Sequence, residues 1–353
     1  ANIGPKRTLA GELILRAVVE LKNPTPNMTL KYVENVTEQD FFLKAIESCL
    51  VAAKPSFSND LVYKAHVKDH AIVSCYNALP LAGGAYTLLR LRLGTLVKAV
   101  NSVDEFVNKL LPKVSACMLS MMDKRIAYLV EKSNFFETSF LIKEGFIKRE
   151  NFTAMFGLVG LANAVNSLLK YEGLSEKYGG SSRGDEIAHL IMKKLEEIVN
   201  THEGKYVDRT NNHYLLHGQV GASLSEEDYD NTPAHRIPVG DEPSLPEHLK
   251  QSGQFHHYFP SGTGDLFAFD QTSVDHLEAV SDIIKGAFNS GYQYITTYLQ
   301  KSDLIRITGY LVKRSEVMKV ANEEVVLRDT DIFGHGTNQN AHLFERRTRI
   351  NDR

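Results

Sequence analysis

The sequence predicts an α/β fold, and two features of its pattern support that prediction. Segments with apolar residues at helical spacing alternate with short apolar segments that suit buried strands, which is the order that an α/β domain requires. Hydrophobic residues make up 43% of the 353 residues and charged residues 24%, so the chain can build a large core.

Composition also limits the setting in which the protein works. Three cysteines without framework spacing predict a reducing compartment, and the net charge of −3 gives no electrostatic reason to expect nucleic-acid binding. No apolar run reaches the length that a membrane helix needs. We therefore expect a cytoplasmic protein that binds neither nucleic acid nor a membrane.

Helical spacing of apolar residues predicts four helices along the chain. They cover residues 41–53, 103–131, 185–199 and 275–300. Pro112 lies inside the second of these segments and is expected to kink or split it, because proline removes a helix hydrogen bond.

One short strand and one long loop complete the prediction. The apolar run at residues 71–75 suits a short buried strand, and the small residues at 82–85 suit a turn. Residues 225–252 contain four prolines and are expected to form a long loop over the opening of the domain.

The three cysteines occupy different contexts. Cys49 and Cys117 lie in predicted helices with apolar neighbours, where free cysteine acts as a small buried hydrophobe. Cys75 ends the predicted strand at residues 71–75. A reactive cysteine that points from a strand tip into a cavity would have this context.

The segment Arg-Ile-Thr-Gly-Tyr at residues 306–310 resembles the motif that carries the radical in glycyl radical enzymes, with Ile307 in place of the usual valine. A radical on a backbone α-carbon needs a planar centre, which a side chain would crowd. Glycine leaves that centre open and tolerates unusual backbone dihedrals. The resemblance assigns the radical to Gly309 and gives Arg306 and Tyr310 the role of supporting the radical loop.

Further segments extend the resemblance over most of the chain. Residues 23–30, 54–60 and 69–75 resemble, in order, barrel segments of pyruvate formate-lyase and its relatives, and residues 157–161 resemble a feature shared with anaerobic ribonucleotide reductases. The chain resembles the YjjI-type glycyl radical enzymes in particular. This resemblance implies part of a ten-stranded α/β barrel in residues 1–290, which carries the cysteine loop, and a C-terminal glycyl radical domain in residues 291–353.

The resemblance also implies a mechanism. A separate activating enzyme that uses S-adenosylmethionine and an iron–sulfur cluster removes a hydrogen from Gly309, and Cys75 then becomes the thiyl radical that abstracts hydrogen from a small-molecule substrate. No permanently bound cofactor or metal is expected. Candidate substrate neighbours are Tyr76, Asn77, His256 and His257.

Departures from better-known subfamilies narrow the chemistry. Pyruvate formate-lyase uses two adjacent cysteines, whereas Ser74 precedes Cys75 here. Diol and choline-cleaving enzymes place a glutamate two residues after the cysteine as a general base, and position 77 is asparagine. The four-cysteine zinc site of anaerobic ribonucleotide reductases cannot form, because no cysteine follows Cys117.

Length raises the question of a partner. Only 74 residues precede Cys75, whereas the resembling family has a long region there. The chain is therefore expected to be a fragment or a half-enzyme that needs an N-terminal half-barrel, since an incomplete barrel exposes strand edges. Homodimers are usual in the resembling family.

The residues leave two alternative functions open. His213 and His217 are spaced i, i+4, and on a helix they could hold the metal of a hydrolase, with His202 and His235 in the same region. A radical-repair or structural subunit of a glycyl radical system is the other alternative. Cys75 and the barrel segments count against it, because a repair subunit needs only the glycine.

Overall fold

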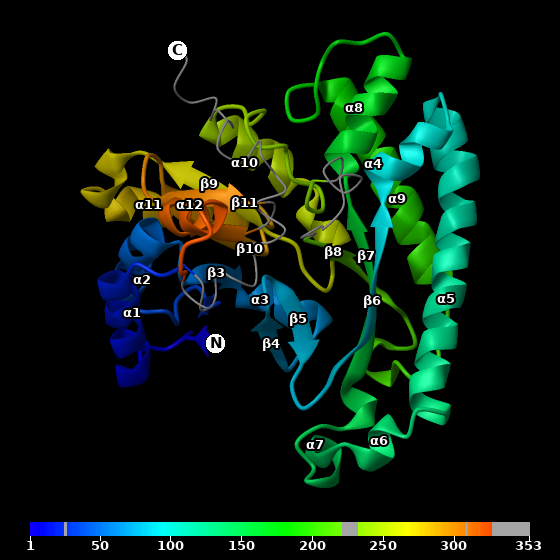
Figure 1. Ribbon diagram of the computed structural model, residues 1–353, viewed down its shortest axis with the longest axis horizontal. Helices are drawn as coiled ribbons and strands as arrows, with labels where there is room; N and C mark the ends of the chain where they lie inside the picture. The colour runs from blue at the N-terminus through cyan, green and yellow to red at the C-terminus, as the bar shows by residue number, and fades with distance from the viewer. Residues whose placement is uncertain (25–26, 221–231, 308–309, 327–353) are drawn as a thin grey trace.

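The computed structural model describes residues 1–24, 27–220, 232–307 and 310–326. In this part of the chain a five-stranded sheet and a three-stranded sheet are each covered by helices, and a short hairpin lies between them (Figure 1). The predicted α/β class is confirmed.

The five-stranded sheet has the order β1-β2-β3-β10-β9. Its pairs are parallel except for β10 with β3, which are antiparallel. Helices α1, α2 and α11 pack against it around a core that includes Phe42, Phe57 and Ile295. The bounds are β1 Asn2–Ile3, β2 Thr29–Tyr32, β3 Ser56–Asn59, β9 Asp265–Phe269, β10 Tyr294–Leu299, α1 Leu9–Leu21, α2 Gln39–Ala52 and α11 Leu277–Asn289.

The three-stranded sheet is parallel and has the order β6-β7-β8. All eight residues of the central strand β7 are buried, which is typical of a parallel strand covered on both faces. Helices α5 and α9 pack on its outer side (Figure 1). The bounds are β6 Gly84–Arg92, β7 Phe152–Val159, β8 Leu215–Gly218, α4 Leu93–Leu96, α5 Leu111–Glu131, α6 Phe135–Thr138, α7 Phe140–Lys143, α8 Leu161–Tyr171 and α9 Ser182–Thr201.

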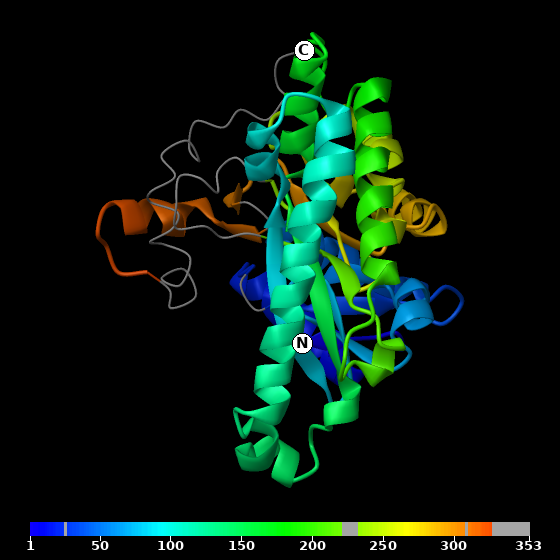
Figure 2. The ribbon, with the colours of Figure 1, turned by 90° about the vertical axis from the view of Figure 1, so that its right-hand side faces the viewer.

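Two hairpins lie outside these sheets. The first pairs β4 with β5 and carries Cys75 in its turn. The second pairs β11 with β12 and is followed by α12, which projects from one side of the molecule (Figure 2). The bounds are α3 Asp60–His66, β4 His70–Val73, β5 Asn77–Pro80, α10 Leu245–Gly253, β11 Leu304–Ile307, β12 Tyr310–Lys313 and α12 Arg314–Ala321.

The predicted helix at residues 275–300 is wrong over its second half. Helix α11 ends at Asn289, Gly291 takes a positive φ of 96°, and the following residues form β10. Glycine adopts this left-handed conformation without strain and ends helices for that reason. The stretch Tyr-Ile-Thr-Thr-Tyr-Leu at 294–299 is rich in β-branched and aromatic residues, which favour a strand.

The predicted loop at residues 225–252 is also wrong at its C-terminal end, because α10 begins at Leu245. Ser244 and Glu247 form a capping box at its start, and Pro246 lies in the first turn, where proline is tolerated. The loop was predicted from its prolines, but this proline starts a helix. Residues 221–231 of the same segment lie outside the described residues.

The other helix predictions are confirmed, with one correction. Pro112 splits the segment 103–131 into a π-helix, Glu105–Leu110, and α5. Cys49 is fully buried in α2, as expected, but Cys117 is exposed on α5. The buried stripe of that helix passes through Met118 instead, so the burial assigned to Cys117 was one position out of phase.

One close backbone contact holds the Cys75 hairpin between the two sheets. Ala78 N donates to Ser261 O at 2.9 Å, and Gly218 N of β8 donates to Gly262 O at 2.9 Å. Gly262 has a φ of 123°, and a Cβ atom on it would lie 2.0 Å from the carbonyl oxygen of Tyr76. Only glycine fits here, because both its conformation and its contact exclude a side chain.

We expect Gly262→Ala to lower the free energy of unfolding by at least about 2 kcal/mol, because it combines a strained φ with a backbone clash. Urea denaturation measures this change. Gly286→Ala is the matched control, since Gly286 lies in α11 with no atom within 4 Å of the added methyl group. That control should be neutral or stabilising by up to about 1 kcal/mol, and equal behaviour of the two variants would contradict the role of the contact.

Candidate active site around Cys75

Cys75 lies in the turn between β4 and β5. The predicted strand at residues 71–75 ends at Val73, two residues early, and Ser74 turns the chain with a φ of 60°. Tyr63 Oη donates to the carbonyl oxygen of Tyr76 at 3.1 Å, which fixes the far side of the turn. The strand tip therefore presents Cys75 to the interior, as expected from the sequence.

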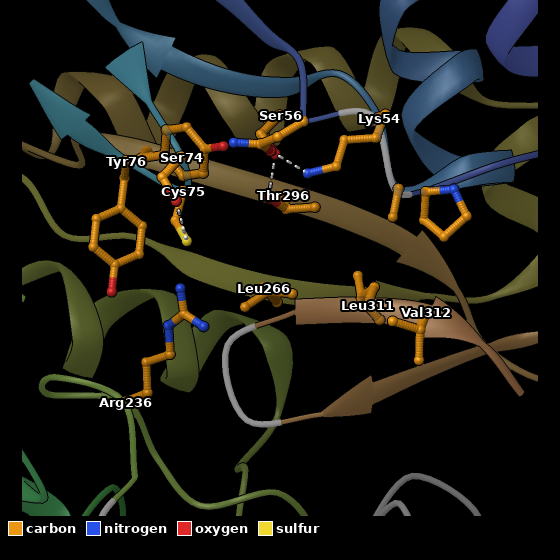
Figure 3. A pocket seen from close by; sticks show the side chains of 14 residues that line it. Lys54, Ser56, Ser74, Cys75, Tyr76, Arg236, Leu266, Thr296, Leu311 and Val312 are labelled. Atoms are coloured by element: carbon orange, nitrogen blue, oxygen red, sulfur yellow. Dashed lines mark hydrogen bonds between the residues drawn. The ribbon is translucent and has the colours of Figure 1, made fainter. Parts of the chain in front are cut away.

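Cys75 lines a cavity of about 190 Å³. Figure 3 shows its sulfur pointing into the space that the guanidinium of Arg236 enters from the opposite side. The polar wall of the cavity includes Lys54, Ser56 and Thr296, and the Oγ atoms of Ser56 and Thr296 are hydrogen-bonded at 2.7 Å. The cavity thus collects side chains from the turn, the five-stranded sheet and the loop before α10.

Two cations face this cavity. Lys54 Nζ donates to Asn27 Oδ1 at 2.7 Å, and burial lowers the pKa of the Lys54 ammonium. Arg236 is only 2% exposed, and its guanidinium carbon lies 5.5 Å from the centre of the Tyr76 ring. Among the described residues that line the cavity there is no Asp or Glu.

The hairpin that flanks the predicted radical glycine reaches the same cavity. Leu311 and Val312 of β12 are both buried and line it. Gly309 itself lies outside the described residues. The backbone of its neighbours is described, and in it Arg306 pairs with Leu311 and Ile307 with Tyr310.

The four predicted substrate neighbours are not all brought to the cavity. Tyr76 lines it, with its ring 5.7 Å from that of Tyr294, which also lines it. Asn77 begins β5 and is not among the lining residues. His256 is fully buried and His257 is exposed, and neither lines the cavity.

His256 belongs to a buried hydrogen-bond network centred on Asp265. Oδ2 of Asp265 lies 2.9 Å from Nε2 of His256 and 3.2 Å from Nε2 of His235, and it accepts from Ser252 Oγ at 2.8 Å. Burial alone would raise the pKa of Asp265, but the two histidines outweigh it and hold the pKa well below its ordinary value. Burial also lowers the pKa of His256 to about 4.

His235, His256 and Asp265 have the spacing of a metal site, with ligand atoms within 4.8 Å of one another. The tautomer of His256 argues against a metal there. The backbone N–H of Gln293 donates to His256 Nδ1 at 3.0 Å, so the ring proton is on Nε2, facing Asp265. A metal on Nε2 would need that proton moved to Nδ1, where it would face the Gln293 N–H. The geometry favours a hydrogen-bonded core.

The helix that would have paired His213 with His217 does not form. Residues 215–218 are strand β8, and His213 Nδ1 contacts the carbonyl oxygen of His202 at 3.2 Å. His217 is buried against Ser261, with Nδ1 3.1 Å from Oγ. The two imidazoles therefore have separate partners, and the alternative of a metal shared between them on one helix face is not supported.

Arg236 and Lys54 are the site residues that the sequence prediction missed. Lys54 stands at the start of the segment 54–60, whose resemblance was recognised, but nothing in its neighbours marks it as buried. Arg236 follows the proline-containing segment before α10, and no local pattern distinguishes it from a surface arginine. Its position depends on backbone hydrogen bonds to α8 and β8, such as Leu161 N to Ala234 O at 3.2 Å.

Comparisons with known proteins show the family of the chain. Residues 1–349 match the model of the family described as glycyl radical enzyme YjjI-like. The chain belongs to the YjjI-like glycyl radical enzyme family. It is 61% identical over 350 residues to an uncharacterized protein of Haemophilus influenzae and 37% identical over 352 residues to the uncharacterized protein YjjI of Escherichia coli. These matches cover 99% of this chain and 68% and 67% of the two relatives.

Solved structures share the fold at low sequence identity. An anaerobic ribonucleotide reductase has a TM-score of 0.67 at 12% identity, over 89% of this chain and 55% of that chain. A glycyl radical enzyme from Archaeoglobus fulgidus has a TM-score of 0.65 at 11% identity, over 85% and 52%. A Roseburia inulinivorans protein described for 1,2-propanediol dehydration has a TM-score of 0.66 at 15% identity, over 88% and 53%. The chain thus spans little more than half of each solved barrel structure, which fits the predicted partial barrel.

In the part of the chain that the structure describes, no helix combines the length and the apolar character needed to cross a membrane.

The buried histidines make stability depend on pH. Burial lowers the pKa of His217 to about 3 and that of His256 to about 4, whereas unfolded histidine titrates near 6.5. As the pH falls from 6.5 to 4, the unfolded chain takes up protons that the folded chain does not, so the free energy of unfolding falls. At pH 5 each of these two histidines should lower the free energy of unfolding by about 2 kcal/mol.

Urea denaturation across this pH range tests the effect. We expect His217→Gln to remove the contribution of His217 to the slope of unfolding free energy against pH. Substitution of the exposed His276 by Gln should leave that slope unchanged. A profile that is flat between pH 6.5 and 5 would contradict the lowered pKa values, because it would mean that the folded and unfolded chains take up protons equally.

Proposed function

We propose that this protein is a glycyl radical enzyme that stores a radical on Gly309 and uses a Cys75 thiyl radical to abstract hydrogen from a small-molecule substrate under anaerobic conditions. The observation that carries the proposal is the shared cavity. Cys75 and the β12 residues Leu311 and Val312, which follow Gly309 by two and three positions, line the same space. Membership of the family supplies the class of chemistry.

The proposed cycle begins with two hydrogen-atom transfers and closes when the same two transfers run in reverse, so that Cys75 returns hydrogen to the product radical and Gly309 returns hydrogen to Cys75. The Cys75 S–H bond breaks and a C–H bond forms at Gly309, which moves the unpaired electron to sulfur. A substrate C–H bond then breaks as the S–H bond of Cys75 forms again, which leaves the radical on the substrate carbon. The protein's contribution is to orient the substrate and to exclude water and oxygen, and apolar walls such as Leu266 and Leu311 suit that task.

Radical formation requires a partner in this proposal. A separate activating enzyme with S-adenosylmethionine and an iron–sulfur cluster removes the first hydrogen from Gly309, whose motif residues Arg306 and Tyr310 support the radical loop. We further propose that the rest of the barrel is supplied by an N-terminal region or a separate half-barrel polypeptide, that the enzyme forms a homodimer, and that it works in the cytoplasm. The three free cysteines suit a reducing compartment.

The departures seen in the sequence support a reaction other than those of the better-known subfamilies. Ser74 stands where pyruvate formate-lyase has its second cysteine. Asn77 stands at the position of the dehydratase glutamate, and the described lining offers no carboxylate to replace that general base. Neither a metal hydrolase built on His213 and His217 nor a repair subunit is favoured.

Electron paramagnetic resonance tests the radical class. After anaerobic activation of the complete assembly, we expect a glycine-centred doublet that is absent from Gly309→Ala, because alanine crowds the planar radical centre. Cys75→Ser should keep the doublet and lose all substrate turnover, since serine cannot relay the hydrogen atom. Substitution of the exposed Cys117 by Ser is the matched control and should change neither property. Absence of any doublet with a competent activating enzyme would contradict the proposal.

Oxygen sensitivity gives a second test. Exposure of the activated protein to air should cleave the backbone at Gly309 and release a short C-terminal fragment, because oxygen adds to the α-carbon radical. Electrophoresis and mass spectrometry detect the fragment and its new terminus. Protein that was never activated, and activated Gly309→Ala, should stay intact. Cleavage in either of these controls would point to a protease.

A further inference from the structure

Two cations line the Cys75 cavity, and the described residues of its lining include no acidic side chain that could neutralise them. They are Arg236, which is 2% exposed, and Lys54, which is half-buried. Because a buried charge is costly without a partner, the arrangement around Arg236 favours binding of an anion.

Arg236 is the more deeply buried of the two cations. Its side chain is 2% exposed, its Nε donates to the carbonyl oxygen of Gly264, and Nη1 is buried with no hydrogen-bond partner in the described structure. Guanidinium stays charged at any pH at which the protein is folded. In Figure 3 this group points toward the sulfur of Cys75. A buried, charged group that keeps an unsatisfied donor and points toward the reactive atom favours the binding of a further acceptor there.

Lys54 offers a second donor on the other side of Cys75. Ammonium has three N–H donors, and Asn27 Oδ1 is the acceptor for one of them. Figure 3 shows Lys54 and Arg236 on opposite sides of the labelled cavity residues. An oxyanion that accepts from the Arg236 guanidinium, with Lys54 adding its field, would hold an adjacent carbon near Cys75.

The cavity volume limits the size of the ligand. A volume of about 190 Å³ corresponds to roughly six water molecules at about 30 Å³ each. Pockets for drug-sized ligands measure roughly 300–1,000 Å³. The space that the described residues enclose therefore suits a small metabolite.

We propose that the substrate of this enzyme is a small organic oxyanion, a carboxylate or a phosphate ester, whose charged group is held by Arg236 and Lys54 while a neighbouring C–H bond faces Cys75. This inference rests on the proposed function, because it places the anion beside the hydrogen-abstracting sulfur. It names Arg236 and Lys54 as the residues that determine specificity for charge.

Alkylation of Cys75 in the complete, unactivated protein tests the anion site without the radical. Iodoacetate and iodoacetamide have nearly the same size and differ in charge. For each thiol, the rate with iodoacetate is divided by the rate with iodoacetamide. We expect this ratio to be about tenfold higher for Cys75 than for N-acetylcysteine, which is the effect of one charge-assisted hydrogen bond. Mass spectrometry of the Cys75 peptide gives both rates.

Variants separate charge from packing. Arg236→Met should lose the preference and Arg236→Lys should keep part of it, because lysine preserves the charge. Lys54→Met provides a second neutral variant if Arg236→Met does not fold, and it should also lower the preference. Substitution of the exposed Arg16 by Met is the matched control and should leave the rates unchanged.

Protection of Cys75 from iodoacetamide identifies the kind of anion. Slower alkylation with propionate indicates a carboxylate, and slower alkylation with inorganic phosphate indicates a phosphate group. Propionamide should not protect. The inference is overturned if the wild-type protein shows no preference for iodoacetate, if the neutral variants keep it, or if propionamide protects as well as propionate.

The outcome is independent of the radical test. A glycyl doublet without an iodoacetate preference would support the proposed function and contradict the proposal of an anionic substrate. A preference without a doublet would leave an anion site and remove the radical chemistry.

Discussion

The backbone of Gly262 touches the carbonyl oxygen of Tyr76, and the position of Cys75 depends on this contact. Gly262 is connected to β8 through Gly218, and its neighbour Ser261 accepts from Ala78 of β5. The reactive turn is therefore attached to the three-stranded sheet on one side, while the cavity in front of it is walled by the five-stranded sheet. A movement of either sheet changes where the sulfur points. Catalytic geometry of this kind needs rigid elements behind it.

The charges of the molecule are divided between two buried centres with opposite arrangements. Around Asp265, Ser252 and His256 both direct donors at Oδ2, so this carboxylate oxygen is satisfied by hydrogen bonds. Around Cys75, the described lining places no carboxylate beside the two cations, and Nη1 of Arg236 has no hydrogen-bond partner among the described residues. The first centre has the features of a structural core and the second those of a binding site. Both are polar clusters, and the difference between them is whether the buried charge is satisfied.

Local sequence patterns predicted the parts of the fold that local interactions determine. The helix at residues 41–53 and the strand tip at Cys75 were predictable because helical spacing and a short apolar run are visible in the sequence. The segment 275–300 misled because apolar residues at 294–299 fit either pattern, and Gly291 was the signal for a break. The predicted burial of Cys117 was wrong by one helical position, and one position turns a side chain by about 100° around the helix axis.

Of the predicted site residues that the structure describes, Cys75 and Tyr76 line the cavity. Arg236 reaches the cavity through contacts between distant segments, which no window of sequence contains. His213 and His217 had a suggestive spacing, but period alone cannot distinguish a helix from a strand of four residues. The role of Gly309 stays a prediction from its motif, because the residue lies outside the described part of the chain.

The hairpin of β11 and β12 has an energetic consequence. Within the described residues its two strands pair with each other and with no strand of the larger sheets, so its separation from the cavity breaks no sheet hydrogen bonds. Its attachment includes the buried side chains of Leu311 and Val312, which together contribute about 3–6 kcal/mol. Separation of these two side chains from the cavity would therefore cost their burial and leave the hydrogen bonds of both larger sheets intact.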